Sequence, residues 1–72
     1  MRPITTIDEA RRTIQDFSGA PEDFVLPISN QLQDPTGVNM VIIVDAILDK
    51  GWEPNGFEQR EGFRIYRYKT MI

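Results

Sequence analysis

The stretch VNMVIIVDAILDKG, residues 38–51, is the longest apolar segment of the chain and determines which architecture can be expected. Its central β-branched run could form a buried strand. The flanking residues favour a helix, because Asp34-Pro35 suits an N-cap followed by a proline at the first helical position, and a glycine closes the segment. A helix is therefore predicted over residues 35–50. A helix that is apolar nearly all round lies at the centre of a core or packs against another surface.

A helix near the N-terminus is predicted from a cap and a periodic apolar pattern. Thr6 and Glu9 have the spacing of a capping box, in which the threonine hydroxyl accepts a hydrogen bond from the Glu9 amide and the Glu9 side chain reaches back. Apolar side chains then recur at helical spacing until Gly19, which can end the helix. The expected helix spans residues 7–18, with acidic side chains in its first turn, where the helix dipole favours them.

The segment between these two helices permits two interpretations. Pro21 and the two carboxylates that follow it are typical of a helix start, and a short helix is predicted over residues 22–32. Pro27 weakens that prediction, because a proline beyond the first turn removes a backbone hydrogen bond. The alternative is an extended piece at residues 24–26 followed by a short helix from Ser29.

A β-hairpin is expected at the C-terminal end of the chain. Two alternating segments flank Glu61-Gly62, whose glycine suits a tight turn, and the predicted hairpin spans residues 57–69. Asn55-Gly56 could instead turn a shorter hairpin that begins at Trp52. Since an isolated hairpin is marginal in water, its apolar side is expected to pack on the helices.

The predicted fold class is α+β, a small single domain over residues 1–72 in which three helices precede a C-terminal antiparallel β-hairpin. This order resembles the winged helix-turn-helix family in outline, where the third helix enters the DNA major groove and the hairpin forms the wing. The resemblance assigns that role to the helix over residues 35–50. This helix presents Asp45 and Asp49 with a single Lys50 at its end, so DNA binding by it is not expected.

Composition excludes most reaction chemistry. The chain has no cysteine and no histidine, which removes thiol catalysis, thiolate metal sites and the commonest general base. The stretch of helix, glycine and hairpin from Ile47 to Tyr66 also resembles small toxin-type RNA-cleaving domains. Those domains use a histidine after the turn glycine, where this chain has Phe63. Asp45 and Asp49 share a helical face and could hold a hard cation, although a solubilising role is the simpler interpretation. The expected protein is therefore not an enzyme and has no cofactor or metal.

Charge is distributed unevenly along the chain. Eight basic and eleven acidic residues give a net charge of −3. Residues 1–49 contain three basic and eight acidic residues, whereas residues 50–72 contain five basic and three acidic residues. An acidic helical part is thus joined to a mildly basic hairpin that also contains tyrosines, and both parts could contact a partner.

These features predict a small non-enzymatic interaction module, a regulator or inhibitor that binds a larger protein. An acidic face fits a basic surface such as a nucleic-acid-handling machine presents, RNA polymerase being one example. The candidate partner-binding residues are Asp8, Glu9, Arg12, Asp16, Arg60, Arg64, Tyr66, Arg67, Tyr68 and Lys69.

Two alternatives remain open at this point. The hairpin could bind nucleic acid weakly through its arginines and tyrosines. The chain could also form a structural homodimer that buries apolar residues around Ile42, Ile43 and Ala46. A cytoplasmic protein without a membrane partner is expected, because no apolar leader and no membrane-spanning stretch is present.

Overall fold

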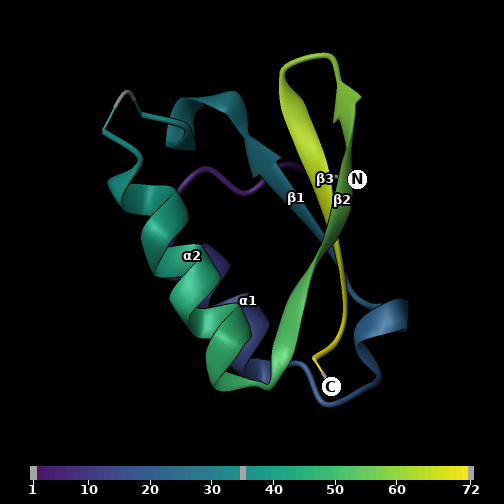
Figure 1. Cartoon of the computed structure of the whole chain (residues 1–72). Coiled ribbons are helices and arrows are strands. Elements are labelled where there is room, and N and C mark those ends of the chain that lie inside the picture. Colours follow the sequence, from purple (N-terminus) through teal and green to yellow (C-terminus); the bar gives the residue numbers. More distant parts are fainter. Residues whose placement is uncertain (1, 35, 72) are drawn as a thin grey trace.

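The computed structural model describes residues 2–34 and 36–71, which fold into two α-helices packed on one face of a three-stranded antiparallel sheet (Figure 1). The strand order is β1-β3-β2, so β3 lies in the middle. The elements along the chain are α1 (Ile7–Asp16), the 3-10 helix η1 (Pro21–Asp23), β1 (Val25–Ser29), the 3-10 helix η2 (Asn30–Leu32), α2 (Val38–Asp49), β2 (Trp52–Arg60) and β3 (Phe63–Thr70).

The structure confirms the predicted cap of α1. Thr6 Oγ1 accepts a hydrogen bond from the Glu9 amide at 3.3 Å. The Glu9 carboxylate pairs with Arg2 at 3.3 Å instead of reaching back to the cap. The helix ends at Asp16, two residues earlier than predicted, because Phe17 leaves the helical conformation to join the core.

The predicted helix over residues 22–32 is wrong, and the extended alternative is close to what the structure contains. Residues 25–29 form strand β1, followed by the single turn of η2. Pro27 fits this strand because its carbonyl accepts from the Ile4 amide at 2.8 Å, on the side away from β3. The amide and carbonyl of one strand residue point to the same side, so the missing N–H removes no bond to β3. Long-range pairing thus overrides the local helix-start signal.

Helix α2 begins later than the sequence predicts. It starts at Val38 rather than at residue 35, and Gly37 takes the N-cap position with a left-handed φ of 74°. The predicted cap at Asp34 is therefore wrong, and Pro35 lies outside the described residues. The other end agrees with the prediction, since the helix stops at Asp49 and Gly51 follows with a φ of 75°.

The predicted turn at Glu61-Gly62 is confirmed, but β2 begins well before residue 57. It starts at Trp52, and Asn55-Gly56 forms a β-bulge within the strand rather than a turn. Pro54 pairs with Tyr68 and Phe57 pairs with Tyr66, so two residues of β2 lie opposite one residue of β3. Gly56, with a φ of 84°, adopts the backbone conformation that this bulge requires.

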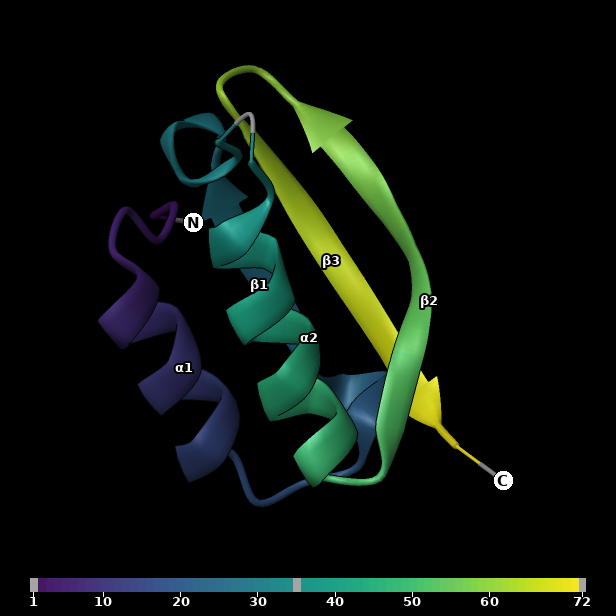
Figure 2. The ribbon, with the colours of Figure 1, turned by 60° about the vertical axis from the view of Figure 1, so that its left-hand side comes forward.

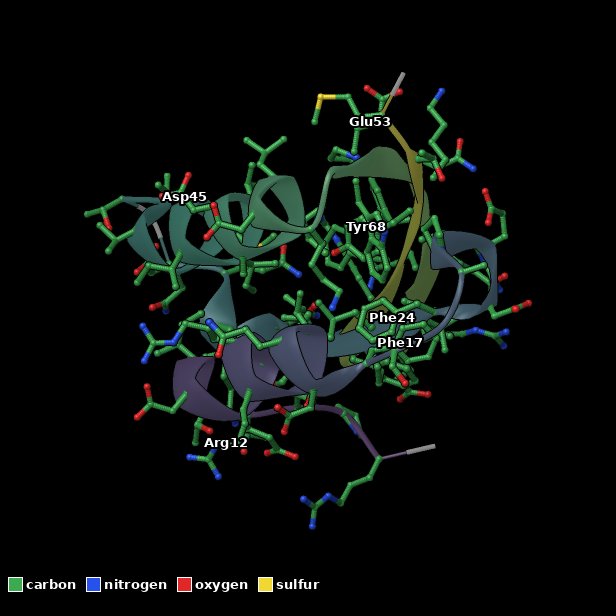
Figure 3. The ribbon with its side chains drawn as sticks, turned by 90° about the horizontal axis from the view of Figure 1, so that it is seen from below. Arg12, Phe17, Phe24, Asp45, Glu53 and Tyr68 are labelled. Atoms are coloured by element: carbon green, nitrogen blue, oxygen red, sulfur yellow. The ribbon has the colours of Figure 1, made fainter. Side chains whose placement is uncertain are left out.

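The core lies between the helices and the sheet. Its largest fully buried side chains are those of Ile14, Leu26, Ile28, Ile43 and Ile47. Four aromatic rings extend this core at the end of the molecule where α1 ends and β2 begins. Figure 3 shows three of them, Phe17, Phe24 and Tyr68, close together. The ring centroids of Phe17 and Phe24 lie 4.8 Å apart, and those of Phe24 and Trp52 lie 5.5 Å apart. Aromatic packing thus joins the end of α1 to the sheet.

Lys50 connects the end of α2 to the end of α1. Its Nζ atom donates to the Phe17 carbonyl at 2.8 Å and lies 5.2 Å from the ring centroid of Trp52. The last turn of α1 contains no basic residue, so Lys50 supplies positive charge at the negative end of that helix dipole. One amine thereby satisfies a helix-end carbonyl and covers the aromatic core.

Lys50→Met is expected to lower the free energy of unfolding by about 1–2 kcal/mol, because it removes a charged hydrogen bond and a cation–π contact. Urea titration followed by the fluorescence of Trp52, the only tryptophan, measures this change. Lys69→Met is the matched control, because the Lys69 amine pairs with Glu53 at 3.5 Å on the exposed surface. This substitution should lower the free energy of unfolding by less than about 0.5 kcal/mol. Equal effects of the two substitutions would contradict the role of Lys50.

Candidate functional site

The acidic residues predicted on the first helix lie on the exposed side of α1, but two of them are paired with arginines. Asp8 pairs with Arg11 at 3.3 Å, and Glu9 pairs with Arg2. Arg12 is also exposed and points away from the core (Figure 3). Together with the exposed Asp16, these side chains give α1 a surface of mixed charge rather than a continuous acidic face.

The basic residues predicted on the hairpin divide between the two faces of the sheet. Arg60, Arg67 and Lys69 alternate onto the face away from the helices. Arg60 pairs with Glu58 there, and Lys69 pairs with Glu53. Among residues 2–34 and 36–71, Arg67 is the cation of this face without an ion pair. The basic surface of the hairpin is therefore largely neutralised by its own carboxylates.

Tyr68 does not form part of any exposed surface. Its side chain is 4% exposed and its ring stacks on Trp52, with centroids 6.5 Å apart. Burial is the main cause that raises the pKa of Tyr68 above the ordinary value of 10.0, and the charge of Tyr66 adds to it. We therefore remove Tyr68 from the candidate partner-binding residues and assign it to the core.

An aromatic group lies on the helix-facing side of the hairpin near its turn. Phe57 is 55% exposed, and its ring centroid lies 5.7 Å from that of Tyr66. The Arg64 guanidinium lies 4.6 Å from the centroid of the Phe57 ring. Arg64 Nε donates to Gln59 Oε1 at 2.8 Å, which holds the guanidinium in place. These contacts pre-organise a large apolar ring that is open to solvent.

Helix α2 exposes a row of apolar side chains, which we name the α2 stripe. Val41, Val44 and Leu48 are 58%, 37% and 45% exposed. Their spacing of i, i+3 and i+7 places them on one side of the helix. The sequence of α2 contains no lysine or arginine, and the exposed Asp45, which is i+4 from Val41 and i−3 from Leu48, lies along the edge of the stripe toward α1. The stripe is thus an apolar surface with an acidic border.

The surface is hollowed between α1 and α2. A hollow of about 310 Å³ is lined by Arg11, Gln15, Ile42, Asp45, Ala46 and Asp49. Asp45 and Asp49 share this space, as their spacing predicts. Within the described part of the chain, no group of three or more acidic side chains is placed to hold a metal ion.

The homodimer surface suggested by the sequence is not exposed. Ile43 and Ala46 are buried in the core, and Ile42 faces the hollow beside α1. Val41, Val44 and Leu48 of the α2 stripe are exposed and lie on another side of the helix. The sequence did contain a signal for this stripe, because the helix was predicted to be apolar on nearly every side.

Among the residues that the structure describes, no helix has both the length and the apolar character needed to cross a lipid bilayer. Comparisons with protein-family models, with curated proteins and with solved structures found no match.

Proposed function

We propose that this chain is a non-enzymatic interaction module that binds a larger protein and regulates or inhibits it by occupying one of its surfaces. The observation that supports this proposal is the α2 stripe. Single exposed apolar side chains are common on protein surfaces, whereas a contiguous row is typical of an interaction site. The stripe lies on a regular helix, so its three side chains are held in fixed positions before binding.

The chemistry around the stripe indicates what kind of partner surface fits it. Asp45 borders the stripe on the side of α1, where it shares the hollow with Asp49 and Arg11, while the nearby Lys50 amine is bound to the Phe17 carbonyl. A complementary surface therefore has an apolar centre and lysines or arginines along one edge. Such charges speed the encounter, and burial of the apolar side chains stabilises the complex.

Nucleic-acid binding is less well supported by the same surfaces. Affinity for phosphates depends on several unpaired cations, and two hairpin cations pair with glutamates. Arg64 is bound to Gln59 and stacked on Phe57. Helix α2, which would face DNA in a winged helix-turn-helix domain, has aspartates and no cations.

A paired capture experiment tests the proposed function. The immobilised chain, its Val41→Ser/Leu48→Ser variant and its Val25→Ser variant are incubated with the same cell extract at low and moderate salt. Val25 is the control, since β1 alternation places it on the sheet face opposite the helices. We expect a protein that the wild-type chain and the Val25→Ser variant retain equally and that the double variant retains at least about tenfold less.

Fluorescence of Trp52 during urea titration shows that each variant is folded before it is used. The α2 stripe is exposed, so the double variant should lose little stability. Retention of the same proteins by all three chains in equal amounts would overturn the proposal, and so would the absence of any retained protein. If Val25→Ser lowers retention as much as the double variant does, the loss is not specific to the α2 stripe, which also contradicts the proposal.

A further inference from the structure

The helices leave the tip of the hairpin uncovered on the helix-facing side of the sheet. Figure 2 shows α1, α2 and β2 in that order across the molecule, so the covering helices end before β2. Leu26, Tyr66 and Phe57 form one cross-strand row, along which the exposed fraction rises from 0% at Leu26 to 55% at Phe57. In the next row toward the turn, Arg64 lies opposite Gln59 on the same side of the sheet. The open area therefore contains an aromatic pair and an arginine.

The Arg64 guanidinium is held in place by its neighbours, which leave some of its N–H groups without a partner. Its Nε atom donates to Gln59 Oε1 at 2.8 Å, and its Nη1 atom lies 3.5 Å from the Tyr66 hydroxyl. Its central carbon lies 4.6 Å from the centroid of the Phe57 ring. Within residues 2–34 and 36–71, Nη2 has no hydrogen-bond partner and no carboxylate forms an ion pair with Arg64. The half-buried positive charge thus lacks a counter-charge in the described part of the chain.

We infer that Phe57, Arg64 and Tyr66, which we name the Arg64 cluster, bind a side-chain carboxylate of the partner that stands next to an apolar residue. This inference rests on the proposed function, because the carboxylate belongs to the partner protein. Arginine N–H groups match the geometry of carboxylate oxygens, and the resulting hydrogen bonds are charge-assisted. Since Gln59 and Phe57 already hold the guanidinium, little side-chain freedom is lost on binding. The exposed Phe57 ring supplies a surface for the apolar neighbour.

The surrounding charges favour one carboxylate over the phosphates of a nucleic acid. The other hairpin cations, Arg60, Arg67 and Lys69, lie on the opposite face of the sheet. Binding to nucleic acid depends on several cations that reach successive phosphates, whereas the unsatisfied N–H groups of Arg64 suit a single carboxylate. The aspartates of α2 do not repel such a ligand at close range, because they line the hollow on the side of α1.

Titration with acidic peptides tests this inference. The probe is a short acetylated and amidated peptide in which one glutamate is flanked by leucines, and the control peptide has glutamine in place of the glutamate. We expect the glutamate peptide to shift the Arg64 Nε–H resonance and the backbone amide resonances of Phe57 and Tyr66 in the isotope-labelled chain. Its affinity should exceed that of the glutamine peptide at least about fivefold. A single-stranded thymidine oligonucleotide tests binding of phosphates at the same cluster.

Two substitutions in β3 separate the Arg64 cluster from general attraction between charges. Arg64→Gln should weaken binding of the glutamate peptide at least about fivefold. Arg67→Gln is the matched control, because it removes the same charge from the opposite face, and it should change the affinity less than about twofold. Arg64→Lys keeps the positive charge without the planar guanidinium and should restore part of the affinity, which separates loss of the charge from loss of the hairpin.

Several results would overturn the carboxylate site. Equal affinities of the glutamate and glutamine peptides would mean that the carboxylate is not recognised, and so would the absence of any shift at millimolar peptide. Equal losses with Arg64→Gln and Arg67→Gln would mean that the attraction is not local. Tighter binding of the oligonucleotide than of the glutamate peptide, lost with Arg64→Gln, would assign the cluster to phosphate.

The capture experiment distinguishes failure of this inference from failure of the proposed function. We expect Arg64→Gln to lower retention of the captured protein, and Arg67→Gln to leave it unchanged. A protein whose retention depends on the α2 stripe but is equal for the wild-type chain and Arg64→Gln would reject the carboxylate site. The proposed function would then still stand, because it depends on the α2 stripe alone.

Discussion

Ile47→Ala is expected to lower the free energy of unfolding by about 2–5 kcal/mol, through lost burial and the cavity that remains. Ile47 is 0% exposed and lies where α2 meets the sheet. A chain of this length has roughly 4–11 kcal/mol of stability in total, and it contains no cysteine for a disulfide. This one substitution therefore removes a large part of the free energy of unfolding. The variant should be partly unfolded near physiological temperature.

Urea titration monitored by Trp52 fluorescence measures the loss, and Val41→Ala on the same helix is the control. Val41 lies in the exposed α2 stripe, so its truncation should change the free energy of unfolding by no more than about 0.5 kcal/mol. The contrast also tests how α2 is oriented. If both substitutions destabilised the chain equally, the side of α2 that we assign to solvent would be buried.

Raising the pH above 10 is expected to destabilise the protein through Tyr68. Burial raises the pKa of Tyr68 in the folded state, whereas the unfolded chain loses this proton near the ordinary value of 10.0. At neutral pH both states keep the proton, so the group has no effect. Above the ordinary value the unfolded state binds fewer protons, and stability falls by up to about 1.4 kcal/mol per pH unit.

Urea titrations between about pH 8 and pH 11 measure this dependence, with Tyr68→Phe as the reference. Phenylalanine keeps the ring and its contacts with Phe24 and Trp52 but has no proton to lose. Stability of the reference variant should therefore fall less steeply with rising pH than stability of the wild-type chain. A wild-type slope no steeper than that of Tyr68→Phe would show that the phenol is not protected by the core.

Local signals in the sequence predicted the elements whose ends depend on nearby residues. The Thr6 cap and the Glu61-Gly62 turn are of this kind, since each satisfies backbone groups only a few residues away. The predicted helix over residues 22–32 failed because β1 forms through pairing with β3, about forty residues later in the chain. The local propensity of residues 22–32 contains no information about a pairing strand so far along the chain.

The candidate surface was harder to predict than the fold. The sequence showed that α2 is apolar nearly all round, but it could not show which of its sides the sheet and α1 cover. The sequence alone therefore does not distinguish the exposed Val41, Val44 and Leu48 from the buried Ile43 and Ile47. From the sequence, the candidate partner-binding residues are instead charged residues of α1 and the hairpin. In the structure many of these residues pair with one another on the surface.

The β-bulge at Asn55-Gly56 changes the parity of strand β2. Before the bulge, even-numbered positions such as Trp52 point toward the helices, and after it odd-numbered positions such as Phe57 do so. A regular strand would have placed Glu58 toward the helices and Phe57 on the opposite face. The extra residue lets one continuous strand supply the core at its base and the open surface at its tip, so the tip can change in sequence without altering the register of the core.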